Sequence, residues 1–344
     1  MDHLMNLQRL DELLSALPAK KIAIIGDFFL DQYMIIDQEL AERSIETGLE
    51  AHQVVELRPS PGAAGSVSTK VAALGVGTVY AVTMLGDDGN GYELSRQLKG
   101  IGLNFDHVVM RTDRFTPTYG KPMIRRAKGT EDEINRIDIK NRLPLPAEVE
   151  RAIIASIRSL AAEVDALIVL DQVEQTNCGV VTDAVRLELV QAAKERPNLI
   201  ILADSRNRIA KFQNMIVKPN FKEAAKALGR HERMESVEEA KDLAHNLARQ
   251  IGRKVFLTVG AKGIVAADGR VTKLVPAYPV RGPLDTTGAG DTVTAGVVSA
   301  LAAAAELVEA AEMGNLAASI TVTQLGTTGT ATPEQMRQAL RSYT

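Results

Sequence analysis

A run of small residues ahead of an apolar stretch is the strongest chemical signal in the chain. Residues 284–292 read Leu-Asp-Thr-Thr-Gly-Ala-Gly-Asp-Thr and lead into a helix-like segment. Small residues let the backbone turn tightly, and N–H groups at a helix N-terminus bind anions. We therefore predict a hole for a transferring phosphoryl group at Gly288, Ala289 and Gly290, with Asp291 beside it as the general base. The pattern also occurs as a glycine-rich turn followed by an acidic residue without chemistry.

A second candidate follows the apolar run at 215–217, where the chain reads Lys-Pro-Asn-Phe-Lys-Glu from residue 218. Asn220 and Glu223 lie one helical turn apart on the same face. Their oxygens suit Mg²⁺ held through its own water ligands. The same spacing is typical of a helix cap in which the two residues bind each other's backbone, and spacing alone favours that cap.

Two weaker candidates lie near the N-terminus. The small residues of Pro61-Gly62-Ala63-Ala64-Gly65-Ser66 run into a helical stretch and permit close approach of a ligand or of another backbone. Asp27 and Asp31 follow the first apolar run, where carboxylates accept hydrogen bonds from sugar hydroxyls or cap neighbouring elements.

The elements that must position these residues alternate along the chain. Apolar runs that predict buried strands occur at 21–26, 78–83, 166–170, 199–203, 215–217 and 255–259. Helical periodicity occurs at 4–17, 64–74, 148–162, 179–195 and 237–251. The alternation predicts an α/β fold with a doubly wound, mostly parallel sheet flanked by helices. Several strands end in a polar residue, which favours ligand binding at the carboxyl edge of the sheet: Asp27, Asp171, Asp204 and Asn220.

Two stretches break this alternation, at about residues 32–58 and 115–139. They carry charged and β-branched residues in place of long helices, so we predict the strands of a small β lid inserted in a single domain that spans residues 1–344.

Composition excludes several classes of function. The 344 residues carry a formal net charge of -3, which gives no reason to expect nucleic acid or an anionic membrane as partner. The single cysteine, Cys178, excludes an internal disulfide framework and suits a reducing compartment. No signal-peptide pattern and no bilayer-length apolar segment occurs, so we expect a cytoplasmic protein.

Taken together, the motifs resemble the ribokinase-like sugar kinases, the PfkB family, in order from about Lys20 to Thr330. Residues 284–291 are similar to the family's second signature, whose final aspartate is the catalytic base. Residues 61–75 are similar to its first signature, which contacts the sugar. Asn220 and Glu223 match the family's Asn-x-x-Glu element for magnesium and phosphate.

The resemblance implies ATP and Mg²⁺ as cofactors and allows a monovalent cation near Asp285. It implies that the nucleotide lies along Thr258, Gly260 and Gly263, with Asn315 on a helix that flanks the adenine. It further implies sugar contacts from Asp31, Gly62 and Ser66, and a homodimer formed through the lid. A dehydrogenase is disfavoured because Asp27-Phe28-Phe29 follows Gly26, where a dinucleotide fold needs further glycines.

Within the family, residues 26–33 (Gly-Asp-Phe-Phe-Leu-Asp-Gln-Tyr) are similar to the opening of bacterial heptose 7-phosphate kinases. Phosphorylation of heptose 7-phosphate at C1 is therefore the predicted reaction, with Lys121 and Arg125 of the lid as cations for the substrate phosphate. The chain departs from this pattern at Ala63 and Ser66, where glycine and asparagine are usual, and in the lid. Another sugar kinase, of the ribose, fructose or fructose-phosphate type, and a catalytically silent sensor stay open as alternatives. Because the chain ends at Thr344, we expect no fused nucleotidyltransferase domain.

Overall fold

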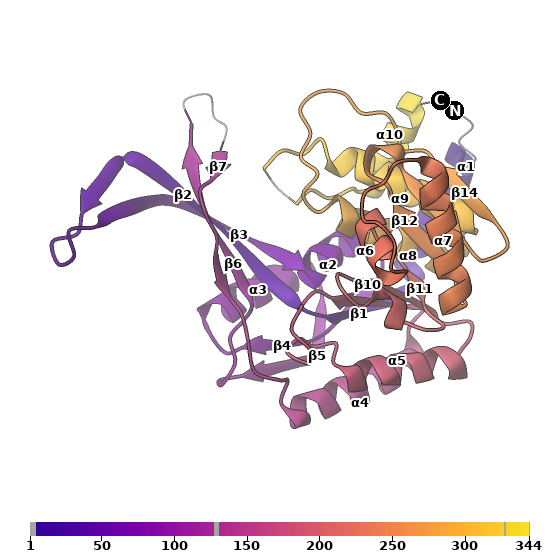
Figure 1. The fold of residues 1–344 in the computed structure, drawn as a ribbon, viewed down its shortest axis with the longest axis horizontal. Helices are drawn as coiled ribbons and strands as arrows, with labels where there is room; N and C mark the ends of the chain where they lie inside the picture. Colours follow the sequence, from indigo (N-terminus) through magenta and orange to yellow (C-terminus); the bar gives the residue numbers. More distant parts are fainter. Residues whose placement is uncertain (1–4, 127–130, 327, 344) are drawn as a thin grey trace.

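A nine-stranded sheet forms the centre of the molecule in this computed structural model, which describes residues 5–126, 131–326 and 328–343. Its strand order is β14-β13-β12-β11-β10-β9-β1-β4-β5 (Figure 1). All neighbouring strands from β12 to β5 pair in parallel, and β13 and β14 add an antiparallel edge. The strands are β1 (Lys21–Gly26), β4 (Thr78–Gly86), β5 (Asn104–Arg111), β9 (Ala166–Asp171), β10 (Ile200–Ser205), β11 (Ile216–Val217), β12 (Val255–Thr258), β13 (Ile264–Ala267) and β14 (Thr272–Val275). The predicted doubly wound, mostly parallel sheet is confirmed.

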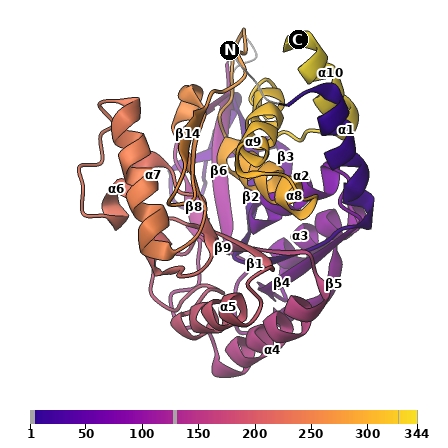
Figure 2. The same ribbon diagram turned by 90° about the vertical axis from the view of Figure 1, so that its right-hand side faces the viewer.

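Helices cover both faces of this sheet (Figure 2). One face packs on α1 (Leu7–Ala16), α2 (Ala64–Ala73), α3 (Gly89–Gly100), α8 (Ala289–Ala302), α9 (Leu307–Thr321) and α10 (Pro333–Tyr343). The other packs on α4 (Ala147–Glu163), α5 (Asp183–Glu195), α6 (Phe221–Ala227) and α7 (Val237–Ile251). Strand β9 shows why its residues are apolar without a break: Ile168 enters the first hydrophobic cluster and its neighbours Leu167 and Val169 enter the second. None of the described helices is long and apolar enough to cross a membrane.

The predicted lid is a separate five-stranded sheet that projects away from the helices (Figure 1). It consists of β2 (Phe28–Arg43), β3 (Glu50–Ala63), β6 (Thr118–Arg125), β7 (Glu131–Glu133) and β8 (Ile137–Ile139). Strand β2 starts at Phe28 and strand β3 ends at Ala63, so both reach closer to the main sheet than the predicted segment 32–58. The reason is that Phe28, Phe29 and Leu30 are buried and continue the chain out of β1. Part of the predicted lid segment, residues 127–130, lies outside the described residues.

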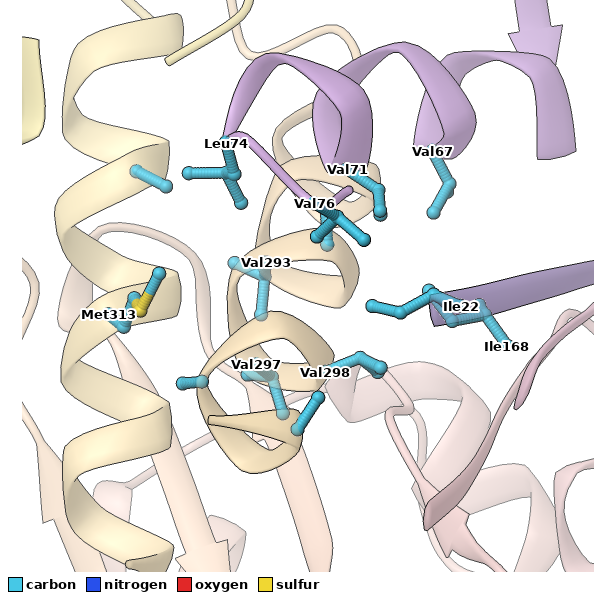
Figure 3. Packing of buried hydrophobic residues seen from close by; sticks show 14 of the residues in the cluster. Ile22, Val67, Val71, Leu74, Val76, Ile168, Val293, Val297, Val298 and Met313 are labelled. Carbon is cyan, nitrogen blue, oxygen red and sulfur yellow. The ribbon is translucent and has the colours of Figure 1, made fainter. Parts of the chain in front are cut away.

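Helices α2, α8 and α9 are packed together by small and branched side chains. Figure 3 shows Val71 of α2, Val293 of α8 and Met313 of α9 in one continuous group. A Cβ atom on Gly296 of α8 would lie 2.9 Å from the Cα of Gly314 in α9, so glycine is needed for the two helices to approach this closely. This packing holds the start of α8 beside α2.

Candidate active site

The first turn of α8 carries the predicted anion hole. Gly288 caps the helix with a φ of 73°, a left-handed conformation that favours glycine. The N–H of Ala289 donates to the carbonyl of Thr286 at 3.1 Å. Within the described residues, the N–H groups of Gly288, Gly290 and Asp291 have no protein acceptor. Three free donors therefore remain at the positive end of the helix, and the predicted donor Ala289 serves to close the turn.

Asp291 is the third residue of α8 and is half-buried. Burial raises the pKa of its carboxyl group, and the nearby Asp204 carboxylate raises it further. The ammonium of Lys70, a hydrogen bond from the Ser66 hydroxyl and the charge of Lys218 act in the opposite direction. Because a raised pKa makes a carboxylate a better proton acceptor, this environment suits a general base.

A buried ion pair lies next to Asp291. The Nζ of Lys218, which follows β11, lies 2.9 Å from Oδ2 of Asp204 at the end of β10. The Thr294 hydroxyl of α8 donates to the same oxygen at 3.2 Å. Burial by itself would lower the pKa of Lys218, but the Asp204, Glu223 and Asp291 carboxylates raise it above its ordinary value. Lys218 therefore stays charged beside the hole.

Asn220 and Glu223 form the helix cap that their spacing allowed. The N–H of Glu223 donates to Oδ1 of Asn220 at 2.9 Å, and the N–H of Asn220 donates to Oε2 of Glu223 at 2.8 Å. Burial and the Asp204 carboxylate raise the pKa of Glu223. The Asp204 and Glu223 carboxylates repel each other, and a cation nearby would relieve that repulsion. The second carboxylate oxygen of Glu223 is not used by the cap, so the cap is compatible with a water-mediated Mg²⁺ site.

On the lid side, the structure brings Asp31, Gly62 and Lys121 together. Oδ2 of Asp31 lies 3.1 Å from the Nζ of Lys121, which also donates to the Tyr33 hydroxyl at 3.2 Å. A Cβ atom built on Gly62 lies 2.9 Å from Oδ1 of Asp31, so only glycine leaves room for this carboxylate. The Asp31 carboxylate is thus oriented by Lys121 and can accept sugar hydroxyls.

Ser66 and Arg125, two other predicted sugar contacts, are placed differently. Ser66 is 1% exposed, and its hydroxyl lies between Lys70 and Asp291. Arg125 lies roughly 13 Å beyond Lys121 along β6 at ~3.3 Å per residue. Its guanidinium binds Glu56 at 2.5 Å and Glu131 at 3.4 Å. The structure therefore does not group Arg125 with Asp31, because lid carboxylates hold it elsewhere.

The predicted nucleotide residues line the carboxyl ends of β11 and β12. The N–H of Thr258 donates to the carbonyl of Pro219, which ties this strand to Asn220. Gly260 is exposed and has a φ of 61°, whereas a Cβ on Gly263 would lie 2.2 Å from the carbonyl of Val275. Gly263 is thus needed to fold the turn.

Asn315 is buried in α9, and its amide donates to the carbonyls of Val275 at 3.0 Å and Pro276 at 3.1 Å. Its observed contacts hold the end of β14. A role beside the adenine stays a prediction.

Two basic features were not predicted from the sequence, and the first of them, a cavity, is lined by neither Asp31 nor Asp291. A cavity of about 220 Å³ opens between the lid and the carboxyl edge of the sheet, and its lining includes Arg136, Lys140 and Arg206. The second feature is Lys70 in α2, which is 1% exposed and whose ammonium group approaches the first turn of α8. Its signal in the sequence is a single charge in the otherwise small and apolar stretch 64–74.

Comparison with known proteins identifies the family of the chain. The chain matches the family described as pfkB family carbohydrate kinase over residues 20–335. It is 31% identical over 323 residues to the bifunctional protein HldE of Azorhizobium caulinodans, covering 93% of this chain and 64% of that relative. It is 29% identical over 328 residues to the bifunctional protein HldE of Caulobacter vibrioides, covering 92% of this chain and 64% of the relative. The chain thus spans slightly less than two thirds of these relatives.

Solved structures share the fold. The ribokinase of Arabidopsis thaliana complexed with ribose and ATP aligns with a TM-score of 0.71 at 17% identity, covering 94% of this chain and 99% of that chain. The phosphofructokinase-2 of Escherichia coli in complex with fructose-6-phosphate aligns with a TM-score of 0.68 at 17% identity, covering 94% and 98%. The fold is therefore ribokinase-like. The chain belongs to the pfkB family of carbohydrate kinases.

Proposed function

We propose that this protein transfers the γ-phosphoryl group of ATP to a hydroxyl of a phosphorylated sugar, with C1 of heptose 7-phosphate as the preferred acceptor. The observation that carries the chemistry is Asp291 beside the three free N–H groups of α8. The acceptor oxygen forms a bond to the γ-phosphorus, its proton moves to the Asp291 carboxylate, and the bond from phosphorus to the ADP oxygen breaks. The N–H donors of Gly288, Gly290 and Asp291 stabilise the charge on the transferring group.

The nucleotide side of the site uses the residues that follow β11 and β12. We place the ATP phosphates between the first turn of α8 and the turn of Thr258, Gly260 and Gly263, with the base toward Asn315. Asn220 and Glu223 would hold Mg²⁺ through water, and the ion supplies positive charge to the phosphates when bound. Lys218 adds a buried, permanent positive charge to the same region.

The acceptor side combines Asp31 with the basic cavity. Asp31 accepts hydroxyls of the sugar ring, and the cations of the cavity bind its phosphate group. Arg136 and Lys140 lie over the Tyr119 ring at 4.3 and 5.2 Å, and both pair with the Asp138 carboxylate, at 2.7 and 2.9 Å. Arg206 makes no ion pair within the described part of the chain and donates to Gln172 at 2.8 Å. We therefore assign the phosphate-binding role predicted for Arg125 first to Arg206, with Arg136 and Lys140 beside it.

The choice of heptose 7-phosphate rests on the motif at residues 26–33 and on the similarity to bifunctional HldE proteins. The buried Ser66 departs from the family pattern and favours testing other sugars.

The decisive experiment measures ADP release with Mg-ATP against free and phosphorylated sugars, heptose 7-phosphate included. Highest kcat/KM on heptose 7-phosphate supports the proposal, while preference for a free sugar contradicts the phosphate-binding role of the cavity. ATP binding without turnover on any sugar would favour the silent sensor.

We further propose that the protein forms a homodimer through the lid. Strands β2 and β3 and their connection expose several large apolar side chains: Leu40, Ile45, Leu49, Val54, Val55 and Leu57. Their burial against a second copy would remove apolar surface from water. Light scattering after chromatography tests this, and a monomer at micromolar concentration contradicts it. We also propose that the protein is located in the cytoplasm. Recovery of the native protein in an extracytoplasmic fraction would contradict this.

A further inference from the structure

Lys70 is a buried cation that the phosphoryl-transfer scheme above does not use. It lies on α2, one turn after Ser66, and is 1% exposed. Its Nζ donates to the Ser66 hydroxyl at 2.8 Å and to the carbonyl of Thr328 at 2.7 Å. A longer contact of 3.5 Å to the carbonyl of Ser66 engages its third donor.

The ammonium group faces the first turn of α8. A Cβ atom built on Gly288 would lie 3.5 Å from the Nζ of Lys70 and 3.8 Å from Oδ2 of Asp291. Both groups therefore border the same point beside the anion hole. The Ser66 hydroxyl accepts from Lys70 and hydrogen-bonds Asp291, so it connects the cation to the carboxylate.

The surrounding charges assign a partner to each buried group. Lys70 faces Asp291 of α8, Ser66 of its own helix and the carbonyl of Thr328. The charges of Asp204 and Lys218 also act on Asp291. Lys218 is already bound to Asp204 at 2.9 Å. Lys70 is therefore the cation that compensates Asp291. Burial lowers the pKa of Lys70 to about 8, and the charge of Asp291 opposes that effect.

We propose that Lys70 is a positioning residue that keeps Asp291 ionised and oriented through Ser66. The inference rests on the proposed role of Asp291 as general base. A nearby opposite charge lowers the pKa of a carboxyl group by about 1 to 3 units. Without Lys70, the half-buried Asp291 would hold its proton to a higher pH, and the Ser66 hydroxyl would lose the contact that orients it toward the carboxylate.

The test is a pH profile of kcat/KM for the wild type, Lys70→Gln and Lys70→Arg. We expect the acidic limb of Lys70→Gln to move about 1 unit or more to higher pH. We expect Lys70→Arg to restore the limb in part, because the charge is retained. Lys241→Gln on the exposed face of α7 is the matched lysine control and should leave the profile unchanged. An unmoved limb in Lys70→Gln would overturn the inference and leave the proposed function intact.

A double-mutant cycle separates positioning from simple loss of packing. If Lys70 acts through Asp291, Lys70→Gln should change the residual rate of Asp291→Asn by less than about twofold. Equal losses in both backgrounds would contradict the inference.

Thermal unfolding gives a readout that needs no turnover. Lys70→Gln leaves the Asp291 charge without its cation, so we expect a lower Tm that Asp291→Asn restores in the double variant. A double variant no more stable than Lys70→Gln, or both failing to fold, would overturn the pairing. If the wild type turned over no sugar, the proposed function would fail while this cycle still decided the pairing.

Discussion

Replacing Gly62 by alanine should weaken sugar binding while leaving the fold and ATP binding intact. The new Cβ atom would lie 2.9 Å from Oδ1 and 3.0 Å from Cγ of Asp31, which is closer than real contacts allow. Gly62 has no positive φ, so alanine fits the backbone and the side chain of Asp31 must move instead. Lys121 holds that carboxylate at 3.1 Å, and therefore limits where it can go.

The magnitude follows from the contact that is lost. A hydrogen bond to a charged group contributes ~1.5–3 kcal/mol, which corresponds to a KM for the sugar raised about 10- to 150-fold. We expect kcat to change less, because Asp31 holds the sugar equally before and during the transfer. Steady-state ADP release with varied sugar, and separately with varied ATP, measures both effects.

The matched control is Gly100→Ala at the end of α3, where an added Cβ meets no atom within 4 Å. It should leave both KM values unchanged. Combining Gly62→Ala with Asp31→Ala should add nothing to Asp31→Ala alone, because the target of the clash is gone. An unchanged sugar KM in a folded Gly62→Ala protein would refute the placement of the sugar at Asp31.

Three other changes test the remaining parts of the site. Because burial raises the pKa of Asp291, kcat/KM should fall on acidification at a higher pH than for an exposed aspartate, as a pH profile will show. Lys218→Met leaves Asp204 buried without its cation, so the free energy of unfolding should fall by ~3–5 kcal/mol in a denaturant titration; no loss would contradict the pair. Arg206→Gln should raise the KM of a phosphorylated acceptor but not of its free sugar, whereas Arg125→Gln, already bound by lid carboxylates, should change neither.

Local patterns were enough to predict the parts of the fold that depend on neighbouring residues. Helix α7 begins and ends at the predicted residues, Val237 and Ile251, because an apolar stripe and a serine cap define it. The cap between Asn220 and Glu223 was open to prediction for the same reason, since both contacts lie within one turn.

Contacts between distant segments were not readable in this way. Helix α5 was predicted from Gly179 but begins at Asp183. The preceding residues form a loop whose Val180 N–H donates to the Asp27 carboxylate at 2.7 Å, a contact between residues far apart in the sequence. Asp27 also accepts from Gln172 and Val173, so it holds this loop.

Ser66 shows the same limit within the site. Its place in a sugar-binding motif predicted a ligand contact, but the lysine one turn later and the carboxylate of α8 engage its hydroxyl. Only the packing of α2 against α8 brings these groups together, and no spacing in the sequence encodes that approach (Figure 3).

The most direct test of Asp291 as the general base is the turnover of Asp291→Asn on the sugar that the wild type prefers. Asparagine keeps the shape of the side chain but accepts no proton, so kcat should fall by about 10²- to 10⁴-fold. ATP binding, measured by calorimetry, should stay within a few-fold of the wild type, because the N–H groups of Gly288 and Gly290 are retained. A variant that binds ATP and turns over at nearly the wild-type rate would contradict Asp291 as the general base.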